Sequence, residues 1–206
     1  MNDKGLKLAV LYSYGCPGSR VQKHNDLFLN FLKGKEKDKE KVKNAIESLF
    51  NSAFYKIIGA QIEKDQFDEE TARLYWTGIP EKELIQSNGL CCFHNFTVLG
   101  AIHRNPNIEI EKIDDCKISV ARIKEIKDKI TVFHYSLIKK EDDTFQIAER
   151  STSKEIEKGF VKKENLKEDV WITYHWNIAR EALKEEQAIC LLRKTKEAIN
   201  LFNQKN

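Results

Sequence analysis

Three features are missing from this 206-residue chain, and each absence excludes a class of protein. No two cysteines are separated by two residues, so a structural zinc knuckle is not expected. The apolar run in the N-terminal segment MNDKGLKLAVLYSYG is too short to cross a membrane, and no signal-type cleavage site follows it. Positive and negative side chains are interleaved, with a net charge of +3, so no basic surface for nucleic acid is expected. The sequence thus favours a cytoplasmic globular protein without a nucleic-acid or membrane partner.

The cysteines are candidates for metal ligands or nucleophiles. There are five, an odd number with irregular spacing, which does not suit a disulfide framework, and cytoplasmic thiols are kept reduced. Cys16 lies on the turn YGCPG, so it is either an exposed thiol near a site or an ordinary loop cysteine. Cys190 falls within the last predicted helix, where packing is its expected role.

The chain up to about residue 88 is predicted to be helical. Apolar residues between Val42 and Ile58 recur at the spacing of one helix face, after a charged run that starts at residue 34. Asp68 is the expected N-cap of a short helix, DEETARLYW, which Gly78 ends. The loop SNG at residues 87–89 then marks a change of pattern.

The segment CCFHNFTVL at residues 91–99 is predicted to be a strand, because it is rich in aromatic and β-branched residues. A period of two places Cys92, His94 and Phe96 on one face. Two interpretations stay open. The cysteine and histidine either bind a metal or act as nucleophile and base, or they belong to a buried strand with a hydrogen-bonded histidine.

From residue 117 onward, short alternating segments predict an antiparallel barrel. KISVARIKEI, ITVFHYSLI and TFQIAER are separated by the charged turns KDK and KKEDD, which predicts two hairpins. With VWITY at 170–174, about five strands would make a small closed or nearly closed barrel. The last helix has an apolar stripe from Ala188 to Phe202. The expected fold is α+β: a helical region over residues 1–112 that ends in the Cys/His strand, and an OB-like β-barrel with a C-terminal helix over residues 113–206.

Three features of residues 116–200 occur in a distinctive order. Cys116 opens the predicted strand KISVARIKEI, the strand VWITYH ends at His175 and is followed by NIA, and the last helix opens with acidic residues. In this order the segment resembles the HypC/HupF family of nickel-iron hydrogenase maturation chaperones. In that family the cysteine is the first residue of the mature protein and a proline follows it, whereas Cys116 is internal and precedes Lys-Ile-Ser. The YGCPG, LYWTG and HNF segments also resemble a prokaryotic family of unknown function, which is associated with hydrogenase gene neighbourhoods.

The resemblance implies a carrier role in metallocofactor assembly rather than an enzyme. Members hold an iron that bears cyanide and carbon monoxide, receive it at a maturation scaffold protein and deliver it to the hydrogenase large-subunit precursor. Cys116 would then be the iron-binding and partner-binding cysteine, His175 the nearby histidine, and Trp176 a partner contact. Thiolate is a soft ligand suited to such iron, and imidazole is an adaptable second ligand. Cys16, Cys92 and His94 are further candidate metal ligands.

Closure of a small sheet brings its first and last strands together, so Cys116 and His175 are expected to lie near each other at one end of the barrel. The plain alternative is that Cys116 is merely buried and His175 merely ends a strand. A second functional hypothesis is a cysteine-dependent enzyme with Cys92 or Cys16 as nucleophile. Its base would be His94 or His134. A third is an interaction module that uses the tryptophans as contact surface, although aromatic residues are more often core. These are Trp76, Trp171 and Trp176.

Overall fold

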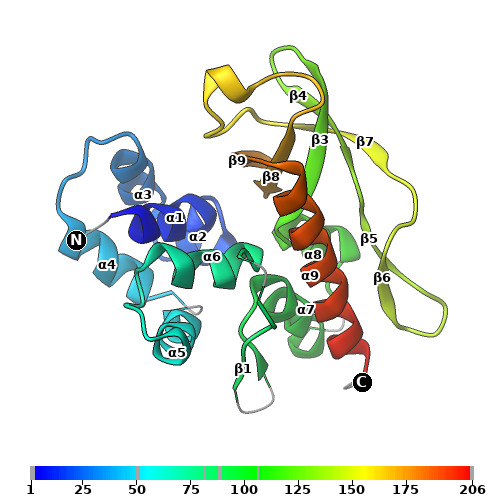
Figure 1. The fold of residues 1–206 in the computed structure, drawn as a ribbon, viewed down its shortest axis with the longest axis horizontal. Helices are drawn as coiled ribbons and strands as arrows, with labels where there is room; N and C mark the ends of the chain where they lie inside the picture. The colour runs from blue at the N-terminus through cyan, green and yellow to red at the C-terminus, as the bar shows by residue number, and fades with distance from the viewer. Residues whose placement is uncertain (1–2, 50–51, 81, 88–89, 106, 205–206) are drawn as a thin grey trace. The chain divides into compact units, whose positions relative to one another are not determined.

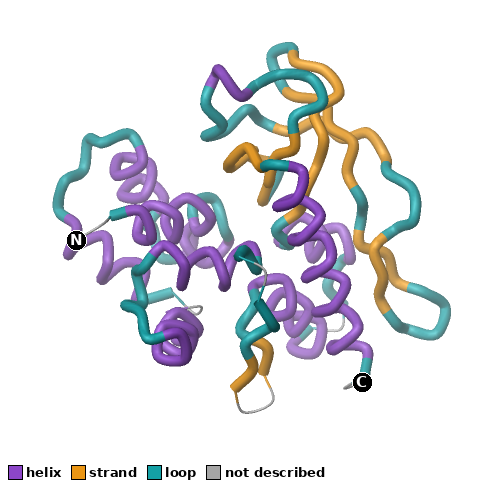
Figure 2. The backbone as a smooth tube through the Cα atoms, in the orientation of Figure 1, coloured by secondary structure: helices purple, strands orange, loops and turns teal. Residues whose placement is uncertain are grey.

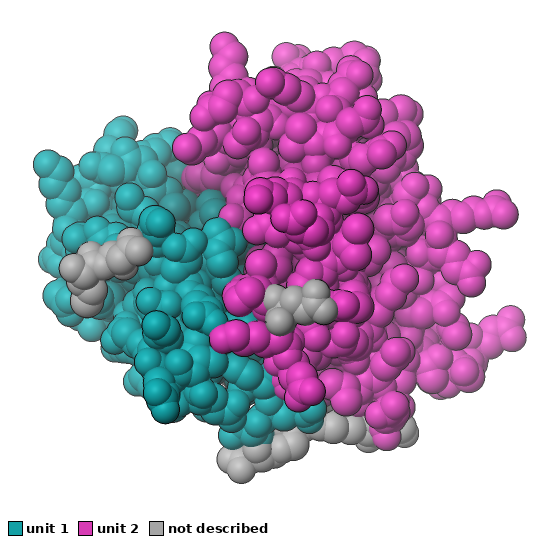
Figure 3. Space-filling view, viewed as in Figure 1, with its two compact units in different colours: residues 1–76, 85–92 teal, residues 77–84, 93–206 magenta. Residues whose placement is uncertain are grey.

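The protein has a mixed α+β fold, as the sequence predicts (Figure 1). The computed structural model describes residues 3–49, 52–80, 82–87, 90–105 and 107–204. Helices come first, antiparallel strands follow, and a long helix ends the chain (Figure 2). The chain forms two compact units, which Figure 3 colours separately: unit 1 with residues 1–76 and 85–92, and unit 2 with residues 77–84 and 93–206. The predicted domain boundary at 112/113 therefore differs from the boundary between the compact units.

Unit 1 is built from short helices. They are α1 (Lys4–Ser13), α2 (Pro17–Val21), α3 (Asn25–Leu32), α4 (Lys39–Glu47), α5 (Ser52–Ile62) and α6 (Glu69–Thr77). The last residue of α6, Thr77, is counted with unit 2. Two short strands, β1 (Gln86–Ser87) and β2 (Leu90–Cys91), also belong to unit 1. The apolar stripe between Val42 and Ile58 falls on two helices, α4 and α5, rather than one. Asp68 caps α6 as predicted, since its Oδ1 accepts a hydrogen bond from the Glu70 N–H at 2.8 Å. The predicted loop at residues 88–89 lies outside the described residues.

Aromatic side chains form much of the core of unit 1. Trp76 is 1% exposed and stacks on Tyr12 with ring centroids 5.5 Å apart, while Tyr75 meets Trp76 edge to face at 4.9 Å. Such ring pairs stabilise a core beyond the area that they bury. Trp76 is thus a core residue of unit 1 and not a contact surface. Within the described part of the chain, none of the helices combines the length and the apolar character that a membrane span requires.

Unit 2 contains a five-stranded antiparallel sheet in the order β7-β4-β3-β8-β9. Its strands are β3 (Ser119–Ile126), β4 (Ile130–His134), β7 (Thr152–Ile156), β8 (Trp171–His175) and β9 (Ile178–Leu183). The strands β5 (Leu137–Lys139) and β6 (Phe145–Ile147) pair in a separate hairpin. A short 3-10 helix, η1, covers Lys163–Asn165. Apolar side chains from these strands, among them Ile123, Val132 and Ile172, form one buried cluster. Helices α7 (His94–Arg104), α8 (Ile110–Cys116) and α9 (Glu185–Asn203) complete the unit.

The two predicted hairpins are confirmed. β3 pairs with β4 around the KDK turn, and β5 pairs with β6 around the KKEDD turn. The strand β9 is not predicted from the sequence, in which the last expected strand ends at His175. After His175 the chain reverses through Trp176 and Asn177, with φ angles of 51° and 58°, and returns as β9 along β8. Two consecutive left-handed residues suit the right-handed twist of a tight hairpin.

A seam of main-chain contacts joins the two outer strands of this sheet. Beyond the end of β7, Glu157 forms a parallel bridge with Ile178, and the Ala179 N–H donates to the Glu157 carbonyl at 3.0 Å. The Phe160 N–H donates to the Ala179 carbonyl at 3.0 Å. Among the described residues, β7 and β9 do not pair with each other as strands, so the expected barrel is not closed by strand pairing. The seam instead brings the two edges of the sheet together.

We expect Gly159→Ala to destabilise unit 2. Gly159 lies at the seam with φ of 55°, and a Cβ atom there would be 2.0 Å from the carbonyl oxygen of Ala179. A left-handed L-residue costs about 1–2 kcal/mol, and the clash with a fixed backbone atom adds to that loss in the free energy of unfolding. Gly100→Ala in α7 is the control, because its added Cβ meets only the end of the Arg104 side chain at 3.8 Å. Equal urea midpoints for the two variants would contradict the prediction.

Two expectations about local structure are wrong. Residues 91–99 are not one strand: β2 ends at Cys91 and α7 begins at His94, so Cys92, His94 and Phe96 do not share a strand face. Residues 94–99 belong to the helix α7, which packs on α9: the ring centroids of Phe96 and Phe202 are 6.2 Å apart. Tertiary packing thus overrides a weak strand propensity. Cys116 also does not open a strand, because it is the last residue of α8 and β3 begins at Ser119.

Candidate metal site

Cys116 and His175 lie at the ends of two elements that the chain holds together. Cys116 ends α8, and His175 ends β8. The N–H of Trp176, in the turn after His175, donates to the carbonyl of Asp115 at 2.8 Å. This bond ties the β8–β9 turn to the last turn of α8 and thereby places the two side chains on neighbouring backbone.

The two side chains approach each other closely within unit 2. The Sγ atom of Cys116 and a ring nitrogen of His175 are within 4.8 Å of one another. Cys116 is half-buried and His175 is completely buried. Arg180 of β9 supports the histidine, since its Nη2 donates to the His175 carbonyl at 3.0 Å. The expected proximity of these residues is therefore confirmed, and a thiolate with an imidazole is a donor pair suited to transition metals.

His94, at the start of α7, contacts both residues. Its Nε2 is 3.0 Å from the carbonyl oxygen of Cys116, and its ring meets the His175 ring edge to face with centroids 5.3 Å apart. A carbonyl oxygen only accepts, so Nε2 carries the proton and Nδ1 does not. Burial lowers the pKa of His94 to about 4, while the bond to Cys116 opposes that shift. His94 is thus neutral at pH 7 and holds the backbone of the cysteine.

Asn95, the next residue of α7, holds the backbone two residues beyond the cysteine. Its Oδ1 accepts from the Ile118 N–H at 2.7 Å, and its Nδ2 donates to the Ile118 carbonyl at 2.9 Å. The same Nδ2 is 2.8 Å from the hydroxyl of Thr195 in α9. Asn95 is 2% exposed, so these bonds satisfy buried backbone groups that have no sheet partner at this point.

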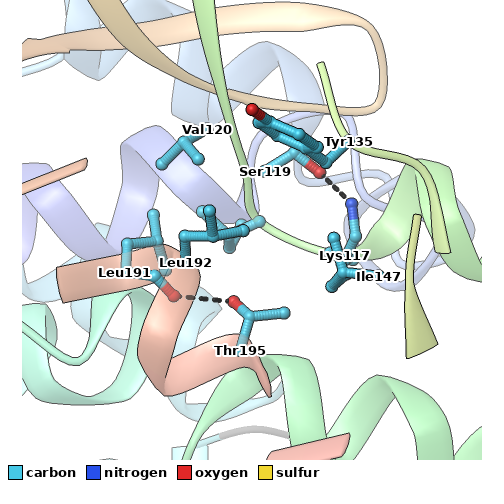
Figure 4. A pocket seen from close by; sticks show the side chains of 9 residues that line it. Lys117, Ser119, Val120, Tyr135, Ile147, Leu191, Leu192 and Thr195 are labelled. Atoms are coloured by element: carbon cyan, nitrogen blue, oxygen red, sulfur yellow. Dashed lines mark hydrogen bonds between the residues drawn. The ribbon is translucent and has the colours of Figure 1, made fainter. Parts of the chain in front are cut away.

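Buried charges follow the cysteine. Lys117 Nζ is 2.8 Å from Asp114 Oδ1 and also hydrogen-bonds the hydroxyl of Ser119, toward which it points in Figure 4. Asp114 Oδ1 accepts the Leu137 N–H at 2.7 Å as well. Burial lowers the pKa of Lys117, and the attraction of Asp114 opposes that shift. The residues on both sides of Cys116 are therefore fixed by buried polar contacts.

His134 contacts two hydroxyl groups. Its Nδ1 is 2.8 Å from the hydroxyl of Tyr174, and its Nε2 is 3.1 Å from the hydroxyl of Thr152. Burial is the main cause that lowers the pKa of His134, and it also raises the pKa of Tyr174. Both ring nitrogens of His134 are thus engaged by neighbouring hydroxyls.

Cys16 and Cys92 belong to unit 1, and their roles as ligands stay predictions. Burial raises the pKa of the Cys92 thiol, which disfavours the thiolate that a nucleophile requires. Cys190 packs within unit 2 with its Sγ 3.7 Å from the Gly78 carbonyl. Asn95 is not predicted from the sequence, because a single asparagine in an apolar segment carries no signal of its role.

The matched family has no known function. A family model described as "Family of unknown function (DUF6390)" matches residues 63–206. Neither a curated protein nor a solved structure matches the chain.

Proposed function

We propose that this chain, which belongs to the DUF6390 family, binds a transition-metal ion through Cys116 and His175 and acts as a carrier in nickel-iron hydrogenase maturation. The observation that supports binding is the approach of Cys116 Sγ to a ring nitrogen of His175, within 4.8 Å. These residues come from distant segments, which the main-chain bond from Trp176 to Asp115 joins, and the side chains of His94 and Arg180 hold their carbonyl groups. A soft thiolate beside an imidazole favours iron, cobalt, nickel or zinc over magnesium or calcium.

The described part of unit 2 brings together two candidate ligands, Cys116 and His175, and a site with few protein ligands suits a carrier. Structural metal sites are usually closed by four protein ligands and keep their metal. Cys116 and His175 would occupy two positions, and His94 Nε2 is already bonded to the Cys116 carbonyl. The other positions would stay free for ligands that the metal brings with it and for a ligand of the receiving protein. A site of this kind can release its metal to a partner.

The cargo and partners follow from the HypC/HupF resemblance. The cargo would be an iron ion that bears cyanide and carbon monoxide, taken from a maturation scaffold protein and delivered to the hydrogenase large-subunit precursor. Low-spin iron of this type is stabilised by thiolate, which Cys116 supplies. The order of β3, β8 and α9 in unit 2, with Cys116 before β3 and His175 at the end of β8, supports this assignment. Trp176, in the turn next to the site, would contact the partner.

The test is anaerobic purification of the wild-type protein and of single-alanine variants from cells that make hydrogenase. We expect iron in the wild type, with infrared bands of cyanide and carbonyl, and co-purified precursor. Cys116→Ala should remove the iron with its infrared bands and also the co-purified precursor. His175→Ala should weaken iron binding about 10–100-fold, as expected for a second ligand or an orienting group. Cys16→Ala in the same series tests whether Cys16 is a further ligand.

Cys190→Ala is the matched control, since it removes a buried thiol from the same unit and should leave iron content unchanged. Wild-type iron retention in Cys116→Ala would end the carrier hypothesis. Loss of iron together with loss of a cooperative melt would show that Cys116 is structural. Metal binding without cyanide and carbonyl bands would keep the metal site and reject the proposed cargo.

A further inference from the structure

The geometry points to Asn95 as the residue that positions the cysteine of the metal site, an inference that rests on the proposed function. Ser119 pairs with Tyr174 at the start of β3, and the ladder ends there. The next residue toward α8 is Ile118, whose buried N–H and C=O both need partners. Asn95 supplies them through its Oδ1 at 2.7 Å and its Nδ2 at 2.9 Å. The carboxamide thus replaces a neighbouring strand at this residue.

This replacement allows the backbone to leave the sheet and reach α8. Had Ile118 stayed in the ladder, its backbone would have continued along β8 instead of turning into the helix that ends at Cys116. The turn is held on both sides of Lys117: His94 bonds the Cys116 carbonyl at 3.0 Å, and Asn95 bonds Ile118. Both holding residues come from the first turn of α7.

Asn95 is itself fixed by α9. Its Nδ2 is 2.8 Å from the Thr195 hydroxyl, which donates to the Leu191 carbonyl at 2.8 Å; the Thr195–Leu191 bond is drawn in Figure 4. The Thr195 hydroxyl uses its hydrogen for Leu191 and therefore accepts from Asn95. These bonds leave one orientation for the carboxamide, with oxygen toward the Ile118 N–H. A supporting residue held in this way can set ligand geometry, and such residues commonly affect metal affinity about 10–100-fold.

The chain offers a matched control for Asn95. Asn203 of α9 makes the same pair of bonds to one residue of β6: its Oδ1 accepts from the Phe145 N–H at 3.0 Å, and its Nδ2 donates to the Phe145 carbonyl at 2.8 Å. Phe145 is remote in sequence from both proposed ligands. Asn203→Ala therefore removes a comparable clamp without touching the backbone around Cys116.

The experiment is an anaerobic Co²⁺ titration of the full chain, followed by the thiolate-to-cobalt charge-transfer absorption. It is run at a temperature where circular dichroism shows every variant to be folded. We expect Asn95→Ala to weaken Co²⁺ binding about 10-fold or more and to change the cobalt spectrum, and Asn203→Ala to keep both the affinity and the spectrum of the wild type. Asn95→Asp keeps the acceptor for the Ile118 N–H and loses the donor, so its affinity should lie between them.

Three results would overturn the inference. The first is wild-type affinity and spectrum in Asn95→Ala. The second is an equal loss in the Asn95 and Asn203 variants, which would indicate general loosening of the unit. If Asn95→Ala does not fold, a folded Asn95→Asp with wild-type affinity decides against the inference in the same way. If the wild-type protein binds no Co²⁺, the proposed metal site is wrong. This failure of the proposed function is visible before any variant is compared.

Discussion

Asp114→Ala is expected to destabilise unit 2 by about 3–5 kcal/mol, because it leaves the charge of Lys117 buried without its partner. Lys117 is 4% exposed and Asp114 is 8% exposed, and their charged atoms are 2.8 Å apart. The variant also removes the acceptor of the Leu137 N–H. Urea unfolding at pH 7, followed by circular dichroism, measures the loss.

The loss should depend on pH. Burial already lowers the pKa of Lys117 below its usual value, and Asp114 opposes that shift, so Asp114→Ala lowers the pKa further. Between that lowered pKa and the usual value, the unfolded chain binds more protons than the folded one, and stability rises with pH. The difference between wild type and variant should therefore be fully present below the lowered pKa of the variant and shrink as the pH rises toward the usual value of lysine.

Two comparison variants separate the buried charge from the loss of a side chain. Asp114→Asn combined with Lys117→Met keeps an acceptor for Leu137 and removes both charges, so it should recover most of the stability, since apolar replacement of buried pairs is often neutral. Glu109→Ala breaks an ion pair with Lys112 whose side chains are 65% and 61% exposed, and should cost less than about 1 kcal/mol. A double variant as unstable as Asp114→Ala would contradict the explanation.

The metal-free protein should lose stability on acidification, and His94 should cause much of that loss. Its pKa is lowered from 6.5 to about 4 by burial, so the unfolded chain binds more protons between these values. Stability is then fully present above pH 6.5 and falls as the pH drops through the window to about 4. A shift of this size corresponds to roughly 3 kcal/mol for a fully buried histidine.

His94→Gln provides the comparison, because the glutamine amide can still donate to the Cys116 carbonyl but does not titrate. In buffer with a chelator, the variant should show a flatter dependence of unfolding free energy on pH between 6.5 and 4. His134 contributes in the same direction, since burial lowers its pKa too, so some slope remains. Parallel curves for wild type and His94→Gln would show that protonation of His94 does not govern acid stability.

Local patterns predicted the strands better than the site. The hairpins β3–β4 and β5–β6 follow from alternation and charged turns, because each strand has one buried face. The helix α7 did not follow, since its aromatic and β-branched residues favour a strand locally, whereas the packing of α7 against α9 is a contact between distant segments. β9 was missed because its six residues, IAREAL, carry no alternation that separates them from the helix that follows.

The site was half predictable. Cys116 and His175 were identified by residue type and order, and their proximity depends on a single main-chain bond, from Trp176 to Asp115, that no side-chain pattern encodes. Asn95 and His94 act on the backbone of residues 116 and 118. Such contacts depend on where α7 packs, so they could not be read from the sequence around them.

The seam between β7 and β9 has a consequence for association between molecules. An edge strand with unpaired N–H and C=O groups is a template for pairing with another chain and hence for aggregation. β7 and β9 are the edges of this sheet, and the contacts of Glu157 and Phe160 with Ile178 and Ala179 occupy part of the exposed edge of β9 with the chain's own backbone. The segment after β7 thus protects the edge of β9, and Gly159 permits the close approach on which this protection depends.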